Sequence, residues 1–165
     1  MERPQGKLRN MTGVYLYREE QLLMLYRVGS RVVSPSWCGV GGHFEQEELN
    51  RARDCALREL FEETGIREVD IDHLAFRYVT LRLKNGEIRQ NYYFFGALKE
   101  GMPLPETCGE GKLAWVPFDQ VLEREMPFTA RGVLEHYFKE GRFTDHLYAG
   151  ISTPGGTEFI RLEEF

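Results

Sequence analysis

The sequence predicts an α/β fold, with strands of one sheet sandwiched between helices. Three observations predict it. Residues 49–64 have the spacing of an amphipathic helix, residues 73–84 and 87–99 flank an Asn-Gly hairpin signal, and residues 129–140 read as a further helix. With 165 residues, the chain suits a single domain, residues 1–165, that can bury a sizeable core.

The chain begins with two short predicted strands, residues 14–17 and 22–26, around a polar turn. Residues 28–36 read as a loop, because glycine, serine and proline interrupt them. Residues 37–42 then read as a short strand that ends in a glycine turn. These elements lead directly into the predicted helix.

The helix is expected from Leu49 to Thr64, with Gly65 in the favoured position just past its end. At roughly 100° per residue, its large apolar residues fall within an arc of roughly 120°, and its last three glutamates point well away from that arc. The apolar set is Leu49, Leu57, Leu60 and Phe61. We therefore expect one face to pack on the core and the other to stay polar.

Two long strands, residues 73–84 and 87–99, follow, because Asn85-Gly86 tolerates the positive φ angles of a tight hairpin. The aromatic run at 92–95 places a ring on each face and predicts a central strand. The remaining expected elements are a strand at 112–116, a helix at 118–124, a helix at 129–140 capped by Thr129 and stopped by Gly141, and a C-terminal hairpin within 145–162.

Composition bounds the class of function. A net charge of −5 offers no basic surface for a nucleic-acid polymer. Cys38, Cys55 and Cys108 are odd in number and lack C-x-x-C spacing, which fits a reducing compartment. Residues 1–10 lack the apolar core of a signal peptide, and the longest apolar runs are too short for a membrane span. We expect a cytoplasmic monomer or homodimer.

The chemistry concentrates in residues 58–66, Arg-Glu-Leu-Phe-Glu-Glu-Thr-Gly-Ile. Glu59, Glu62 and Glu63 stand at i, i+3 and i+4, a spacing that clusters three carboxylates on one side of a helix. Their mutual repulsion is unfavourable unless a cation relieves it, and Mg²⁺ takes oxygen ligands of this kind. Upstream, Gly41-Gly42 lets the backbone approach a metal or phosphate closely.

These residues resemble the signature of the Nudix hydrolase family, G-x5-E-x7-R-E-U-x-E-E-x-G-U with U aliphatic. Gly42 corresponds to the first glycine, and residues 58–66 match the second half at every fixed position. Glu48 falls at the first glutamate, but nine residues separate it from Arg58 where the family has seven, and counting back from Arg58 reaches Asn50 instead. Because two residues turn a helical side chain by roughly 200°, we expect Glu48 to have a weaker catalytic role.

The resemblance implies an α/β/α sandwich with a mixed sheet, and Mg²⁺-dependent (or Mn²⁺-dependent) hydrolysis of a nucleoside diphosphate linked to a further group, X. It implies Glu59 and Glu63 as metal ligands, Glu62 as ligand or general base, and the Gly41 carbonyl as an additional ligand. Arg58 is expected to orient a glutamate, since a guanidinium can grip a carboxylate with two bonds.

Family members often use a further carboxylate on a loop before a strand. Glu110, between two glycines, fits that place. Glu106 is the competing candidate, and an ordinary solvated glutamate remains a third interpretation.

Substrate choice is less clearly encoded. The candidate contacts are Arg27, Trp37, Gly42, Asn91 and Phe128. Val40 before the glycine pair, and the segments 115–117 and 126–130, resemble bacterial 8-oxo-dGTP diphosphatases. We therefore expect a (d)NTP such as 8-oxo-dGTP to be cleaved to the monophosphate and pyrophosphate. ADP-ribose, a nucleotide sugar and a dinucleoside polyphosphate are alternatives, and a non-catalytic nucleotide sensor is an alternative of another class.

Overall fold

One mixed sheet runs through the protein, as seen in a computed structural model that describes residues 6–28 and 34–165. The strand order is β6-β7-β2-β1-β5-β4-β8-β9, with β3 paired to the end of β2. Pairs β1–β5 and β4–β8 are parallel, and the other pairs are antiparallel. The strands are β1 (Lys7–Arg18), β2 (Gln21–Arg27), β3 (Ser36–Cys38), β4 (Ile71–Lys84), β5 (Glu87–Leu98), β6 (Thr107–Cys108), β7 (Gly111–Pro117), β8 (Tyr148–Thr153) and β9 (Gly156–Arg161).

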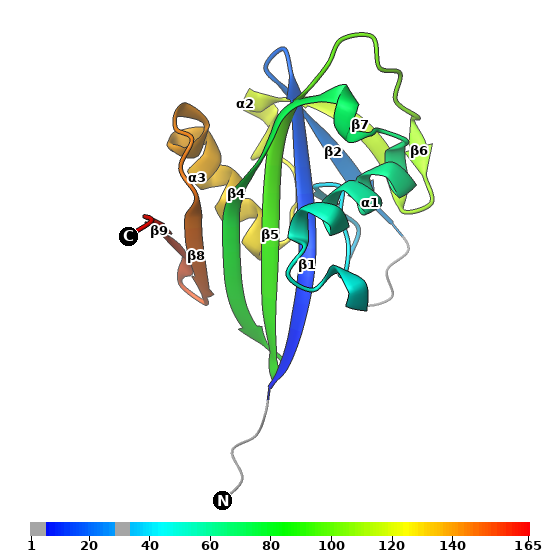
Figure 1. Ribbon diagram of the computed structural model, residues 1–165. Coiled ribbons are helices and arrows are strands. Elements are labelled where there is room, and N and C mark those ends of the chain that lie inside the picture. The colour runs from blue at the N-terminus through cyan, green and yellow to red at the C-terminus, as the bar shows by residue number, and fades with distance from the viewer. Residues whose placement is uncertain (1–5, 29–33) are drawn as a thin grey trace, which may run out of the picture.

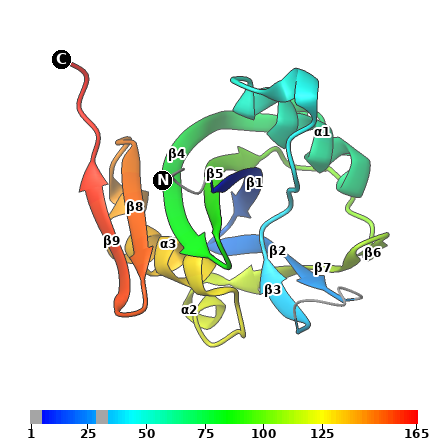
Figure 2. The ribbon, with the colours of Figure 1, turned by 90° about the horizontal axis from the view of Figure 1, so that it is seen from below.

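Helices cover both faces of this sheet (Figures 1 and 2). Helix α1 (Ala52–Thr64) lies on one face, and α2 (Phe118–Val121) and α3 (Phe128–Lys139) lie on the other. Single turns of 3₁₀ helix occur at Gln46–Glu48, Glu68–Asp70 and Gly141–Phe143. The predicted α/β/α sandwich with a mixed sheet is confirmed.

The core is split in two by the sheet, because successive strand residues point to opposite faces. Under α1, the core includes Val14, Leu23, Phe94, Ala56 and Leu60. Under α3, it includes Tyr15, Met24, Tyr93, Phe95, Val133 and Leu134. The predicted central strand at 92–95 is therefore correct: β5 lies between β1 and β4 and buries a ring on each side.

Turns explain how the strands connect. The β4–β5 hairpin turns through Asn85 and Gly86, with φ of 53° and 74°, as predicted. The β1–β2 turn uses Glu19 and Glu20, with φ of 49° and 61°, conformations that L residues rarely adopt. In the segment where a hairpin was expected, β8 and β9 pair with each other, and β8 extends the sheet beside β4.

Several element boundaries differ from the prediction. Strand β1 starts at Lys7, seven residues early, because β5 pairs with it in parallel along its polar beginning. The helix predicted for 118–124 ends at Val121. Thr129 does not cap α3; it lies in the first turn, buried, with its hydroxyl near that of Ser152. The predicted loop at 28–36 falls mostly outside the described residues.

Helix α1 also differs in start and orientation. It begins at Ala52, not Leu49, because Asn50 has a φ of 66° and interrupts the helix. Leu60 is buried, but Leu49 and Phe61 are half exposed. The buried stripe is centred instead on Cys55, Ala56, Leu60 and Thr64. The expected separation between an apolar face and the glutamates is therefore wrong, since two glutamates flank the buried stripe.

Within the described residues, no helix combines the length and the apolar character that a membrane crossing requires.

Candidate active site

The glycine pair brings the chain across β1 and under helix α1. The Thr12 amide donates to the Gly42 carbonyl at 2.9 Å, and the Val14 amide donates to the Val40 carbonyl at 2.6 Å. A Cβ on Gly41 would lie 2.0 Å from the Thr12 carbonyl oxygen, and one on Gly42 would lie 2.5 Å from a carboxylate oxygen of Glu59. Gly41 therefore needs glycine, whereas a side chain on Gly42 would displace the Glu59 carboxylate, which rests directly on the Gly42 backbone.

Arg58 forms hydrogen bonds with three carboxylates at and beside α1. Its Nε and Nη2 donate to the two oxygens of Glu48 at 2.9 and 2.8 Å. Its Nη1 donates to Glu59 at 3.0 Å and to Glu62 at 3.1 Å, and Nη2 also donates to the His43 carbonyl at 3.1 Å. One guanidinium thus fixes three carboxylates relative to the glycine turn.

Glu48 reaches Arg58 because the two extra residues are accommodated before the helix. Glu48 ends a 3₁₀ turn, where its carboxylate accepts the Glu45 amide at 2.9 Å. The chain then reverses through Leu49 and Asn50, and α1 starts at Ala52. The expected 200° rotation of Glu48 away from Arg58 is wrong, since Glu48 is not on the helix. Asn50, the alternative, is exposed.

Arg27, at the end of β2, joins the glycine turn to two further carboxylates. Its Nη2 donates to the Gly41 carbonyl at 3.1 Å and lies 3.7 Å from Glu63. Its Nε lies 3.8 Å from Glu110, whose carbonyl accepts the Val28 amide at 3.2 Å. Glu106 is exposed, and its carbonyl accepts the Leu113 amide. The loop before β7 therefore places Glu110 against the group formed by Arg27 and Glu63.

The partly buried carboxylates of Glu59 and Glu63 hold protons more tightly than ordinary glutamates do. Burial raises the pKa of Glu63 to about 7, with Arg27 opposing the change and Glu59 adding to it. Burial also raises the pKa of Glu59, against the opposing effect of Arg58. The hydrogen bonds from Arg58 lower the pKa of Glu48 instead. Ionisation is thus unfavourable at Glu59 and Glu63, whereas at Glu48 the hydrogen bonds from Arg58 favour it.

This constellation of a glycine turn, an arginine hub and helix glutamates has a counterpart among known proteins. The sequence matches the NUDIX domain family over residues 7–137, which is most of the chain. The chain belongs to the Nudix family. As a Nudix hydrolase, it acts on pyrophosphate bonds.

Solved structures share its fold. A MutT protein from Bacillus halodurans is 23% identical, with a TM-score of 0.66 over 92% of this chain and 97% of that one. A C. elegans Ap4A hydrolase is 15% identical, with a TM-score of 0.66 over 79% and 96%. The NUDIX domain of Shewanella oneidensis NrtR, solved with ADP ribose, is 17% identical, with a TM-score of 0.60 over 86% and 90%.

Nudix hydrolases generally use divalent metal ions, and the donor atoms here fit a hard cation. Glu63 Oε2 is buried and lacks a hydrogen-bond partner, and the Gly41 carbonyl and the Glu59 carboxylate lie on the same side of α1. Over residues 6–28 and 34–165, however, no three acidic, histidine or cysteine side chains converge in a metal-binding arrangement. Glu62 is instead hydrogen-bonded to Arg58.

The predicted substrate contacts fall into two groups in this Nudix fold. Arg27 and Gly42 lie with the glutamates. Trp37, on β3, packs on Tyr26 and lies 5.3 Å from the guanidinium of Arg124, whose Nε is buried without a partner. The position of Arg124 against β3 could not be predicted from the sequence, because nothing in the segment around it indicates that it folds back there.

Asn91 and Phe128 lie farther along the sheet. Asn91, on β5, is in register with Met11 on β1 and Thr80 on β4, and Phe128 opens α3 beneath the guanidinium of Arg82 at 5.0 Å. Neither side chain forms a hydrogen bond with the glutamates in the described part of the chain.

Proposed function

We propose that this protein is a pyrophosphohydrolase, dependent on Mg²⁺ or Mn²⁺, of nucleoside diphosphates linked to a further group. The first substrates to test are (d)NTPs such as 8-oxo-dGTP, cleaved to the monophosphate and pyrophosphate. The observation that carries the proposal is the partly buried pair Glu59 and Glu63 beside the Gly41-Gly42 turn, with a buried, unpartnered oxygen on Glu63.

In this proposal, Glu59, Glu63 and the Gly41 carbonyl hold the cation, which neutralises the pyrophosphate charge, and Glu62 serves either as a further ligand or as the general base. Arg58 keeps two carboxylates of α1 and the carboxylate of Glu48 in place through its hydrogen bonds to Glu59, Glu62 and Glu48. In the role of general base, Glu62, which is half exposed, leaves its hydrogen bond with Arg58 and accepts a proton from water.

Arg27 and Glu110 complete the proposed site from the opposite side. Arg27 can exchange its weak contacts with Glu63 and Glu110, at 3.7 and 3.8 Å, for a phosphate oxygen when a cation binds the glutamates. Glu110 is half exposed on its loop and can approach the same cation. A non-catalytic sensor would not need this complete set of acidic side chains.

The substrate must be found by experiment, because the solved structures of this fold include both an Ap4A hydrolase and an ADP-ribose complex. A hydrolysis screen should use Mg²⁺ and Mn²⁺ with oxidised and normal (d)NTPs, ADP-ribose, nucleotide sugars and dinucleoside tetraphosphates. Glu63→Gln should lower turnover at least about 100-fold, and Glu158→Gln, at an exposed glutamate on β9, is the matched control. No cleavage of any nucleotide by the folded protein with either metal would refute the proposal.

A further inference from the structure

Three arginines lie side by side on one face of the sheet. Arg82 of β4 is in register with Arg89 of β5, and Arg89 is in register with Arg9 of β1. Residues in register on neighbouring strands present their side chains to the same face. This is the face of Tyr78 and Tyr93, which lie four residues inward along β4 and β5 beneath α3.

Such a row is costly for the fold, because like charges directly opposite one another on adjacent strands repel. Glu87 offsets part of that cost, with one oxygen 3.0 Å from Arg9 and the other 3.6 Å from Arg89. The next row outward adds Lys7 and Lys84, both in register with Glu87. These two rows thus carry five cations and one carboxylate, in a protein whose net charge is −5.

The guanidiniums are not simply dispersed into solvent. The Arg89 side chain is only 23% exposed, and its Nε is buried without a hydrogen-bond partner. The Arg82 guanidinium is held over the Phe128 ring at 5.0 Å. A buried donor without a partner costs free energy, so an acceptor bound beside this row would be stabilising.

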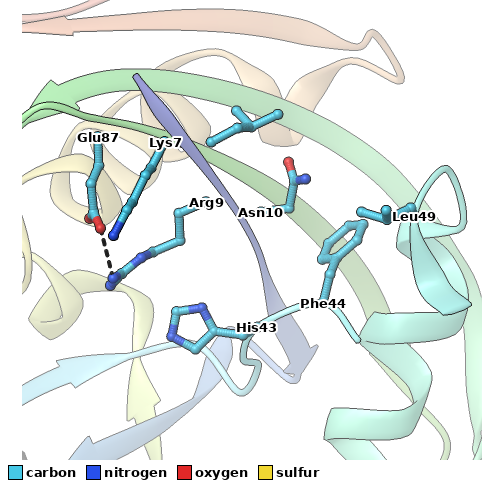
Figure 3. Close-up of a pocket in the computed structure, with 8 residues that line it drawn as sticks. Lys7, Arg9, Asn10, His43, Phe44, Leu49 and Glu87 are labelled. Atoms are coloured by element: carbon cyan, nitrogen blue, oxygen red, sulfur yellow. Dashed lines mark hydrogen bonds and ion pairs between the residues drawn. The ribbon is translucent and has the colours of Figure 1, made fainter. Parts of the chain in front are cut away.

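The row also continues from the proposed active site. His43 follows Gly42, against which Glu59 rests, and its backbone bridges to Met11 of β1. Lys7, Arg9 and His43 line a pocket of about 340 Å³ beside Glu87 (Figure 3). Positive charge therefore extends outward from the glycine turn along this face.

We propose that Arg9, Arg82 and Arg89 bind a phosphate group of the substrate other than the pyrophosphate that is cleaved. This inference rests on the proposed function and narrows it, because the substrate must then carry a separate phosphate, as a 2′- or 3′-phosphorylated nucleotide does. Guanidiniums pair with phosphate through two parallel bonds, and adjacent ones can share its three oxygens. An uncharged nucleobase would need no more than one of these three arginines.

Binding can be measured without turnover, in chelator, by calorimetry with AMP, adenosine 2′,5′-bisphosphate and adenosine 3′,5′-bisphosphate. The unaltered protein should bind at least one bisphosphate at least about tenfold more tightly than AMP, the effect of one charge-assisted hydrogen bond. The double variant Arg82→Gln/Arg89→Gln should lose that difference. Glu87→Gln should enlarge it, because the carboxylate no longer competes for Arg9 and Arg89. Arg161→Gln, on exposed β9, is the matched control.

Equal affinity of the unaltered protein for all three ligands would overturn the inference. So would an equal loss for AMP and the bisphosphates in the double variant, which would mean that the arginines contact the base. If the double variant does not fold, Glu87→Gln decides alone, and an unchanged preference would refute the second phosphate site. If the protein hydrolyses nucleotides but does not bind a bisphosphate more tightly than AMP, only the present inference is refuted. If it binds a bisphosphate more tightly than AMP but hydrolyses no nucleotide, only the proposed function is refuted.

Discussion

The variant Glu63→Gln separates two effects of this carboxylate: its effect on the free energy of unfolding and its role in hydrolysis. Burial raises the pKa of Glu63 from 4.5 to about 7 in the metal-free protein, so the folded state binds this proton more tightly than the unfolded chain does. The stability gained from the neutral form is therefore complete below pH 4.5 and is lost as the pH rises through about 7. At pH 8 the ionised side chain, which is 8% exposed, costs up to about 3 kcal/mol.

Glutamine keeps the size of Glu63 and removes its charge. In chelator at pH 8, the variant should be more stable to urea than the unaltered protein by up to about 3 kcal/mol, and near pH 5 most of that difference should disappear. Hydrolysis with Mg²⁺ should fall at least about 100-fold, the scale of a lost ligand or its partner. Equal stabilities at both pH values would show that Glu63 is not desolvated. Full activity would refute its place in the site.

Three further predictions follow from other contacts. Glu48→Gln should lower both kcat and the free energy of unfolding at pH 7, because Arg58 loses a charged partner. The pKa of Glu48 is lowered in the folded state, so this stabilisation is lost at low pH. The urea midpoints of the variant and the unaltered protein should therefore converge as the pH falls below the ordinary range of a glutamate. Glu110→Gln should lower kcat with little change in KM, whereas Glu106→Gln in parallel should change neither; if only the latter loses activity in steady-state kinetics, the assignment moves four residues along the loop. Asn50→Ala should lower the free energy of unfolding by about 1 kcal/mol, because the φ of residue 50 is 66°, whereas Asn50→Gly should not lower it. Equal melting temperatures of the two variants would contradict the strained turn.

The sequence predicts those parts of the fold that depend on local chemistry. Gly65 ends α1 with a φ of 76°, and Asn85-Gly86 forms the predicted hairpin, because both depend on the few residues that tolerate positive φ. The two-residue turn at Glu19 and Glu20 illustrates the limit, since neither residue type favours that conformation. There the pairing of β1 with β2 imposes the turn.

The candidate site was predictable as a set of residue types, but its contacts were not. The helix glutamates follow from spacing, yet the rotation of α1 that buries Glu59 and Glu63 depends on how Ala56 and Leu60 pack. The arginine row could not be read from the sequence at all. It depends on the parallel register of β1 with β5, and parallel pairing joins residues some eighty positions apart.

The reversal at Leu49 and Asn50 has a consequence for how related chains are recognised. In this chain the Glu48 carboxylate pairs with the Arg58 guanidinium although nine residues separate them, because the extra residues lie outside the helix, at an exposed junction. A search that fixes the number of residues between these two positions would pass over this chain. A search that lets that spacing vary, while keeping the glycine pair and the Arg-Glu-x-x-Glu-Glu run fixed, would retrieve it.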